Sequence, residues 1–285
     1  MFTYNLNVPR SVDLSGKTVF LSASVPSIER NEQYRRIANA AVSIEEAVLA
    51  VTRAVFSAGG RLVFGAHPSI SPLVASVIGE YIAPEVSSPE NKNRSESKES
   101  ERRANVFMYQ SKAWAELWAE RSKELAERPQ VHLRWTDAAP GEKVDSKTLS
   151  KPQVPESMRK MRRQMISETS PAAMVAIGGM EGVEEEVKLF TELCPNKPVF
   201  VFSTTGGAAG IIAERHKDYK SHILVVDENS LDDVKKFWAS RESHDSRSSD
   251  SQKIREGSAH ADYRDCRYYV PYSVLAQQIV KKIAG

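Results

Sequence analysis

The stretch that decides the fold is MVAIGGMEGVEEE, residues 174–186. It begins with an apolar run typical of a strand buried on both faces, turns at Gly178 and Gly179, and continues into the start of an acidic amphipathic helix. Glycine lets a backbone approach an anion closely, and the amides and dipole of a helix N-terminus stabilise phosphate. The order strand, glycine turn, helix therefore predicts an α/β fold with an anion-binding turn.

A second glycine loop follows the next expected strand, where residues 199–210 read VFVFSTTGGAAG. In a parallel sheet both loops emerge at the carboxyl ends of the strands, where open α/β sheets bind ligands. Thr204, Thr205, Gly206 and Gly207 are therefore candidate ligand contacts. The alternative is that the hydroxyl groups of residues 203–205 cap the helix that begins near Gly206.

Short apolar or β-branched runs alternate with longer amphipathic segments along the chain. The expected strands are 17–21, 61–64, 105–109, 131–135, 172–177, 198–202 and 222–226. This alternation predicts a Rossmann-like, doubly wound, mainly parallel sheet with helices on both faces. In the expected helical segment 111–128, Trp114, Leu117, Trp118 and Leu125 form a stripe that we expect to pack on the sheet.

Three polar segments interrupt the pattern, at 87–103, 137–154 and 241–260. They are rich in Ser, Lys, Glu, Arg and Asp and nearly free of apolar residues, which is typical of mobile loops. Strands flank each of them and the helical pattern resumes afterwards. We therefore interpret them as insertions into a single domain that spans residues 1–285.

Composition excludes several classes of protein. The 285 residues are 41% hydrophobic and 27% charged with a formal net charge of +2, whereas a dedicated nucleic-acid binder normally shows a strongly basic surface. The two cysteines, Cys194 and Cys266, have no Cys or His nearby in a metal-ligand spacing, so no metal site is predicted and no cofactor is implied. No secretion signal or membrane span is visible, which predicts a cytoplasmic protein.

Further candidate residues lie on a methionine-rich helix and at the ends of two strands. Met158, Met161 and Met165 share one face of the helix, while Arg159, Arg162 and Arg163 cluster on another, where they could clamp a phosphate or form an exposed basic face. Ser22 and Ser24 end the first strand, and Gly65 and His67 end the second. His67 is interpreted as a ligand or backbone contact, with general acid–base catalysis as the alternative.

These segments together resemble the SLOG superfamily, which includes the LOG phosphoribohydrolases, the Smf/DprA proteins and the N-terminal region of TRPM channels. The LOG pattern has an arginine in a methionine-rich helix, then a strand, then Pro-Gly-Gly-x-Gly-Thr-x-x-Glu. Arg162, the strand that ends at Ile177, and residues 178–186 occur here in that order. Residues 20–26 (FLSASVP) and 65–68 (GAHP), with residues 177–182, look most like the SLOG cluster-3 branch.

The resemblance implies roles for particular residues. Arg162 corresponds to the catalytic arginine of the LOG enzymes, and Glu186, or Glu185 if the turn is accommodated differently, corresponds to the catalytic glutamate. Gly178, Gly179 and Gly182 correspond to the phosphate-binding glycines. The chain departs from the pattern because Ile177 replaces the proline, Val183 replaces the threonine, and one extra residue separates Gly179 from Gly182.

The leading interpretation is a binding module for a nucleotide or a nucleotide-derived ligand related to NAD or ADP-ribose. By resemblance it acts as a sensor or signalling component, in the context of bacterial antiviral defence, and forms a homo-oligomer. The alternative is a LOG-like hydrolase (N-glycosidase) that cleaves the N-glycosidic bond of a nucleotide or NAD-like substrate. Nucleic-acid binding through Arg159, Arg162 and Arg163, by analogy with Smf/DprA, is the least expected function.

Overall fold

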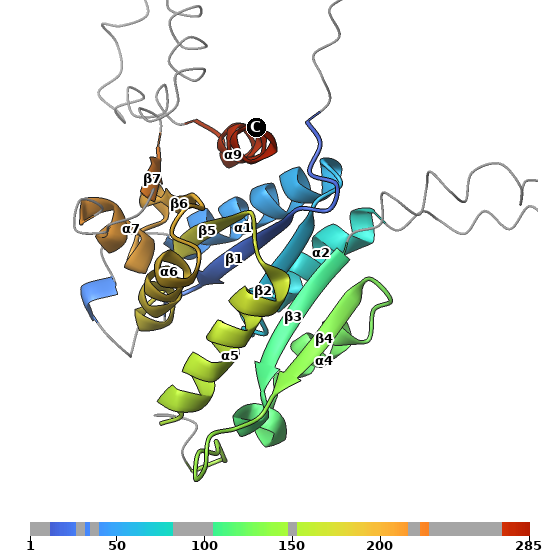
Figure 1. The fold of residues 1–285 in the computed structure, drawn as a ribbon, viewed down its shortest axis with the longest axis vertical. Helices are drawn as coiled ribbons and strands as arrows, with labels where there is room; N and C mark the ends of the chain where they lie inside the picture. Colours follow the sequence, from blue (N-terminus) through green and yellow to red (C-terminus); the bar gives the residue numbers. More distant parts are fainter. Residues whose placement is uncertain are drawn as a thin grey trace, which may run out of the picture.

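A computed structural model describes residues 12–26, 32–34, 40–81, 105–147, 153–215, 223–227 and 270–285. These residues form a seven-stranded sheet in the order β4-β3-β2-β1-β5-β6-β7, and every neighbouring pair is parallel (Figure 1). The strands are β1 Thr18–Ser24, β2 Arg61–Gly65, β3 Asn105–Ser111, β4 Val131–Thr136, β5 Ala173–Gly178, β6 Val199–Phe202 and β7 Ile223–Val226. The predicted Rossmann-like α/β fold is confirmed, with a strand at each of the seven predicted places.

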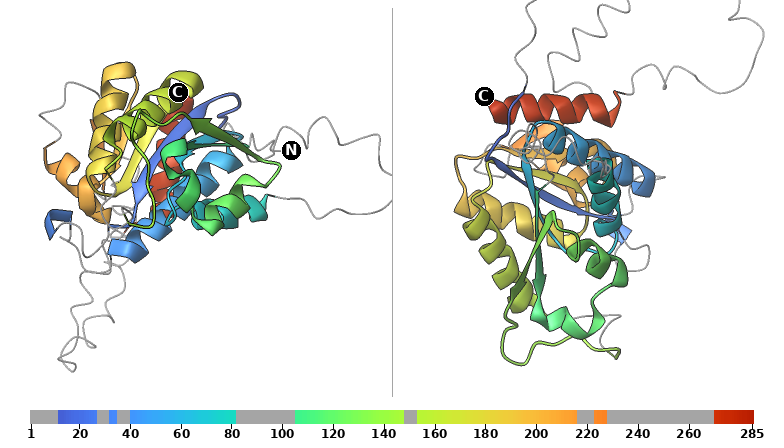
Figure 2. Two further views of the ribbon diagram at one scale, coloured as in Figure 1. Left: turned by 90° about the horizontal axis from the view of Figure 1, so that it is seen from below. Right: turned by 90° about the vertical axis from the view of Figure 1, so that its right-hand side faces the viewer.

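Helices cover both faces of this sheet (Figures 1 and 2). One layer contains α1 Ala40–Ser57, α2 Ser71–Glu80, α4 Glu120–Ala126 and α9 Tyr272–Ala284, and the other contains α5 Pro155–Thr169, α6 Glu181–Leu193 and α7 Gly207–Glu214. Strand β5 shows why two layers are needed. Ala173, Val175 and Ile177 are buried with the first layer and Met174 and Ala176 with the second, because successive side chains point to opposite faces.

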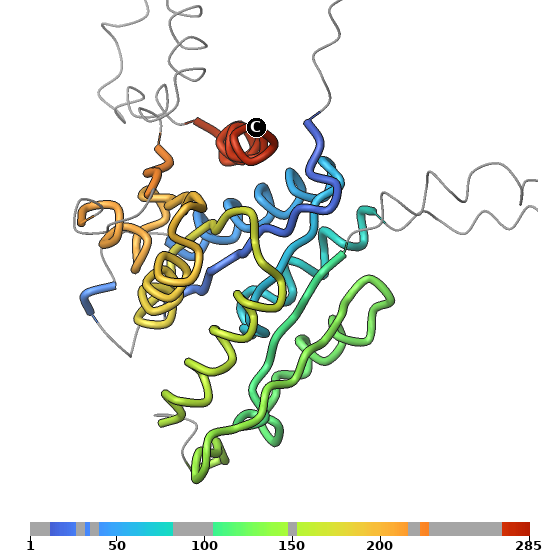
Figure 3. Tube along the Cα trace, in the orientation of Figure 1, coloured from blue at the N-terminus to red at the C-terminus, as the bar shows by residue number. Residues whose placement is uncertain are grey.

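The topology positions a crevice at the centre of the sheet. The chain builds strands outward from β1 to β4, then returns to pair β5 with the other side of β1 and continues outward to β7, as the trace in Figure 3 shows. Reversal of the strand order at β1 and β5 is the switch point at which open parallel sheets leave room for a ligand outside their carboxyl ends.

Of the three expected insertions, the structure describes part of one. Segments 87–103 and 241–260 lie outside the described residues, and 137–154 is described except for 148–152. Within it, Val144 and Val154 are buried against Ala113 in a small apolar cluster. The Val144 amide donates a hydrogen bond to the Ala113 carbonyl at 2.8 Å, so this polar stretch supplies structural contacts. In the described ranges no helix is both long and apolar enough to cross a membrane.

Candidate functional site

The turn after β5 requires glycine for reasons of backbone and packing. Gly178 and Gly179 have φ values of 55° and 83°, in the left-handed region that disfavours side chains. A Cβ on Gly178 would overlap Ile44, and one on Gly179 would overlap Val183. The amides of this turn are occupied within the protein: Gly178 donates to Thr205 Oγ1 at 2.9 Å, and Gly179 donates to the Ser24 carbonyl at 2.8 Å.

The second glycine loop packs directly on the first. Gly207 leaves no room for a side chain, because a Cβ there would lie 2.6 Å from the Gly179 carbonyl oxygen, and the Ala208 amide donates to that oxygen at 2.9 Å. Thr205 is fully buried, and its hydroxyl also donates to the Phe202 carbonyl at 2.7 Å. The Thr205 hydroxyl therefore links the two glycine loops, because it accepts from the Gly178 amide of the first loop and belongs to the second.

The main cavity has a volume of about 680 Å³ and opens beside the first strand. It lies at the carboxyl ends of β1 and β2, between the first turns of α5 and α6 and the 3₁₀ helix η3, Lys112–Leu117. Its size falls in the range of small-molecule sites. The predicted site residues that line it are Ser24, Gly65, His67, Arg162, Gly182, Glu185 and Glu186.

The other predicted site residues lie outside this cavity. Ser22, Arg159, Gly178, Gly179, Thr204, Thr205, Gly206 and Gly207 do not line it. Gly206 and Gly207 instead line a separate cavity of about 420 Å³ beside the start of α7. Thr204 Oγ1 lies 3.1 Å from the hydroxyl of Tyr272 on α9. The second loop therefore supports the wall behind the main cavity, and its glycines face a different one.

Arg162 is the centre of the charged cluster at one end of the main cavity. It is only 8% exposed, although it carries a full positive charge, and it bonds two consecutive carboxylates of α6. Arg162 Nη1 donates to Glu185, and Nε donates to Glu186 Oε1 at 3.2 Å. The third nitrogen, Nη2, faces Gly182, where a Cβ would lie 3.0 Å away. A side chain at 182 would crowd this guanidinium.

Glu186 is held from two sides, whereas Glu185 is more open. The buried hydroxyl of Ser22 donates to Glu186 Oε2, so Arg162 and Ser22 together orient this carboxylate, whose side chain is 13% exposed. The Glu185 side chain is 31% exposed, and Arg159 also bonds it, at 3.3 Å. The Ser22 side chain was predicted as a ligand contact, but the structure places it behind Glu186.

The three arginines of α5 do not form a common face. Arg162 turns into the cavity, while the side chains of Arg159 and Arg163 are exposed. Each has a carboxylate nearby: Arg159 pairs with Glu185, and Arg163 Nη2 lies 3.8 Å from Glu192. Glutamates of α6 thus neutralise the positive charges of the arginine cluster on α5. The prediction of an exposed basic face is wrong for Arg162, which is buried.

His67 lines the cavity on the β2 side. Its Nδ1 lies 2.8 Å from Ser69 Oγ and 3.3 Å from the Ser69 amide nitrogen. A backbone N–H can only donate, so these hydrogen bonds assign Nδ1 as the acceptor and place the proton of the neutral ring on Nε2. In that tautomer Nε2 is a hydrogen-bond donor.

The wall opposite Arg162 is apolar, and the sequence did not predict it. Trp114 and Leu117 were expected to pack on the sheet, but they are half-buried and line the cavity; Trp118 both lines it and packs against the core. The expected helix is broken: η3 ends at Leu117, Trp118 is extended, and α4 begins at Glu120. Of the four residues in the expected stripe, only Leu125 is fully buried in the core, and Trp118 is partly buried against it.

Gln110 and Met158 are two further cavity residues that the sequence reasoning missed. Gln110 follows the expected strand 105–109, so the rule that pointed to strand ends would have found it. Met158 lies on the expected methionine face of α5 but is only half-buried, whereas Met161 and Met165 are buried. In the described part of the chain no group of three or more His, Cys, Asp or Glu side chains could hold a metal ion.

Residues 33–231 match the model of the SLOG cluster3 family. The chain belongs to the SLOG cluster3 family. Arg162, Glu185, Glu186 and the two glycine loops all lie inside the matched residues. No curated protein matches the chain. Among solved structures, the X-ray structure of TM1055, a structural genomics target, aligns with 73% of this chain and 91% of its own at 13% identity and a TM-score of 0.39.

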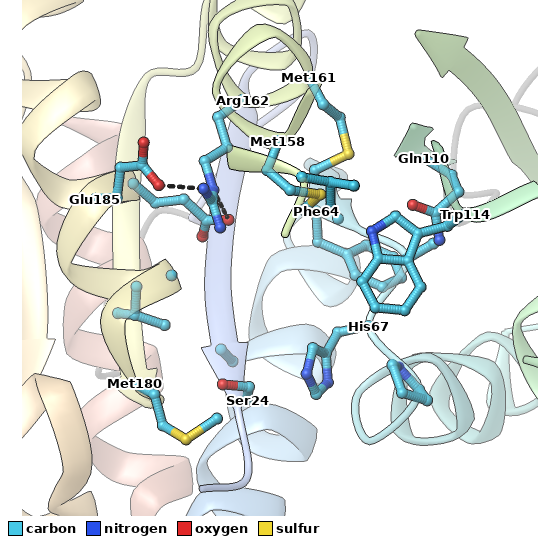
Figure 4. Close-up of a pocket in the computed structure, with 18 of the residues that line it drawn as sticks. Ser24, Phe64, His67, Gln110, Trp114, Met158, Met161, Arg162, Met180 and Glu185 are labelled. Carbon is cyan, nitrogen blue, oxygen red and sulfur yellow. Dashed lines mark hydrogen bonds and ion pairs between the residues drawn. The ribbon is translucent and has the colours of Figure 1, made fainter. Parts of the chain in front are cut away.

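In this SLOG cluster3 protein the cavity thus has a polar end and an apolar end (Figure 4). At the polar end Arg162 faces Glu185 and Glu186, and Glu181 also lines the cavity, so carboxylates outnumber the arginine. Such an end suits hydroxyl groups or a developing positive charge better than a bare phosphate.

Proposed function

We propose that this SLOG cluster3 protein binds a nucleotide or a nucleotide-derived ligand, such as ADP-ribose or NAD, in the 680 Å³ cavity at the carboxyl ends of β1 and β2. The observation that carries the proposal is the arrangement within one cavity of a buried arginine–glutamate cluster and a wall of aromatic and methionine side chains. A nucleotide has matching parts, a polar sugar phosphate and a planar base.

Three parts of the cavity suit three parts of such a ligand. The hydroxyl-rich ribose fits beside Glu185 and Glu186, which accept hydrogen bonds. The phosphate fits beside Ser24 and the first turn of α6 at Gly182, where the helix dipole is positive and Arg162 Nη2 lies close by. The amides of Gly178 and Gly179 take no part, because each already donates within the protein.

Binding without turnover, as in a sensor or signalling component, is the first candidate function. The second is hydrolysis of an N-glycosidic bond, and the geometry of Glu186 favours it as the alternative. Ser22 and Arg162 orient that carboxylate in a largely buried position, and a carboxylate so placed stabilises an oxocarbenium-like sugar or orients a water molecule.

One set of measurements separates these functions. Purified protein is titrated with AMP, ADP-ribose and NAD by calorimetry, and the same mixtures are assayed by chromatography for released adenine or nicotinamide. The variant Glu186→Gln keeps an oxygen for Ser22 but loses the charge. The control Glu192→Gln changes an exposed glutamate of the same helix outside the cavity.

Binding without release supports the sensor. Release that persists in Glu192→Gln and is lost in Glu186→Gln, with binding retained, supports the hydrolase. If none of the three compounds binds and none is cleaved, the proposed function is refuted.

A further inference from the structure

Trp114 presents its indole ring to the cavity, across from the Arg162–Glu185 ion pair (Figure 4). Met158 of α5 and Phe64 of β2 line the same wall. A half-buried tryptophan in the wall of a cavity leaves a large, polarisable face for a ligand, and a planar ring stacks on such a face. Nothing in the Arg162–glutamate cluster accounts for this aromatic wall.

The indole ring is held in place from behind. Ser111 caps η3, because its Oγ accepts a hydrogen bond from the Ala113 amide at 3.2 Å. Ala113 is buried with Val144 and Val154, and Trp114 packs against this small cluster. The ring is thus supported before a ligand arrives, so little conformational entropy is lost when a ligand stacks on it.

Gln110 adds a hydrogen-bond donor at the same wall. The side chain is 7% exposed and lines the cavity. Its Oε1 accepts from the Ser111 amide at 2.9 Å, and because a backbone N–H can only donate, this bond fixes which end of the side-chain amide is oxygen. The Nε2 group makes no hydrogen bond with the described residues and is available to an acceptor atom of a ligand.

We propose that Trp114 and Met158 form the binding subsite for the heteroaromatic ring of the ligand, and that Gln110 Nε2 donates to a nitrogen or carbonyl oxygen at the edge of that ring. This inference rests on the proposed function and adds that the protein recognises the base. A phosphorylated sugar without a base fills only the polar end of the cavity, near Arg162. The protein therefore discriminates base-bearing ligands from sugar phosphates by this wall.

The test removes the indole ring and the base separately. Calorimetry compares AMP with ribose 5-phosphate on the wild type, Trp114→Ala and Trp114→Phe. Truncation to alanine weakens AMP binding by about 5- to 150-fold, the range for loss of one base–aromatic stack, while ribose 5-phosphate binding is unchanged. Trp114→Phe retains most of the AMP affinity because an aromatic face remains.

Two further variants test the donor and the specificity of the effect. Gln110→Glu keeps an oxygen for the Ser111 amide and the size of the side chain but loses the donor, and it weakens AMP binding by at least about fivefold, as expected for an unpaired acceptor. Tyr81→Ala is the control, since Tyr81 packs on Phe56, neither ring lines the cavity, and the loss of Tyr81 leaves AMP affinity unchanged. Circular dichroism verifies that each variant is folded.

The outcomes separate the inference from the function beneath it. If AMP binds the wild type and Trp114→Ala binds it equally well, or if Trp114→Ala weakens AMP and ribose 5-phosphate to the same extent, the ring subsite is overturned and the proposed nucleotide function stands. If neither AMP, ADP-ribose nor NAD binds the wild type, both are overturned.

Discussion

Replacing Arg162 with methionine tests the central cluster without any ligand. Methionine preserves much of the apolar stem but removes the cation from between Glu185 and Glu186, whose side chains are 31% and 13% exposed. Glu185 retains Arg159 at 3.3 Å, whereas Glu186 retains, among the described residues, only the hydroxyl of Ser22. The loss of folding free energy therefore arises mainly from the Glu186 carboxylate, which is left without its cation in a largely buried position.

The magnitude follows from that burial. Breaking a fully buried ion pair by removing one partner costs about 3–5 kcal/mol, and the residual exposure of the two glutamates places Arg162→Met near the lower limit, about 3 kcal/mol. The neighbouring variant Arg163→Met is the matched control. Arg163 and Glu192 have side chains 51% and 63% exposed, so it changes stability by at most about 1 kcal/mol.

Urea unfolding followed by circular dichroism measures both free energies of unfolding, with unchanged m-values as evidence of the same transition. A second variant, Arg162→Met combined with Glu186→Gln, removes the unpaired charge and recovers part of the loss. The reasoning is refuted if Arg162→Met is no more destabilising than Arg163→Met, or if the double variant is less stable than Arg162→Met alone.

Two other predictions concern the glycine turn after β5 and the charge-assisted hydrogen bond between Tyr109 and Glu168. Gly179→Ala destabilises the protein by about 1–3 kcal/mol, because residue 179 has a positive φ and its Cβ would overlap Val183. Gly79 lies in α2 with open space around it, so Gly79→Ala is the control and stabilises the protein by about 0.5–1 kcal/mol in the same urea assay. Tyr109 donates to Glu168 at 2.7 Å and lowers the pKa of that carboxyl, so the pair stabilises the fold above the ordinary carboxyl pKa and loses this contribution as the pH falls through the lowered value. Tyr109→Phe therefore costs about 1 kcal/mol at neutral pH, with a difference from the wild type that shrinks below about pH 4; an equal difference at pH 7 and pH 3 would contradict it.

The elements that repeat along the sequence could be predicted from it. All seven strands were located because parallel strands buried on both faces read as continuous apolar runs. The resemblance to the LOG pattern implied that Arg162 and Glu186 or Glu185 belong to one site, and the structure joins the arginine to both glutamates. Of the residues chosen because they end the first two strands, Ser24, Gly65 and His67 line the cavity and Ser22 does not.

The residues that surround the ligand space were harder to predict, for a physical reason. A stripe of apolar side chains looks the same whether it packs on a core or lines a cavity, since both exclude water. Trp114 faces the cavity because η3 and α4 form two short helices instead of one, and Val144 from a polar stretch supports it. The hydrogen-bond partners of the glycine turn could not be predicted either, because only folding brings Thr205 to the Gly178 amide, 27 residues away in the chain.

The sequence by itself determined the α/β class, the strand positions and the two glycine turns, because burial period and glycine conformation are local properties. Only the tertiary structure decided which arginine of α5 is buried, that Ser22 supports Glu186, and that the second glycine loop packs behind the first. Those outcomes depend on which helix covers which strand ends. They are contacts between residues distant in the chain, which form only when α5 and α6 pack beside each other on the sheet.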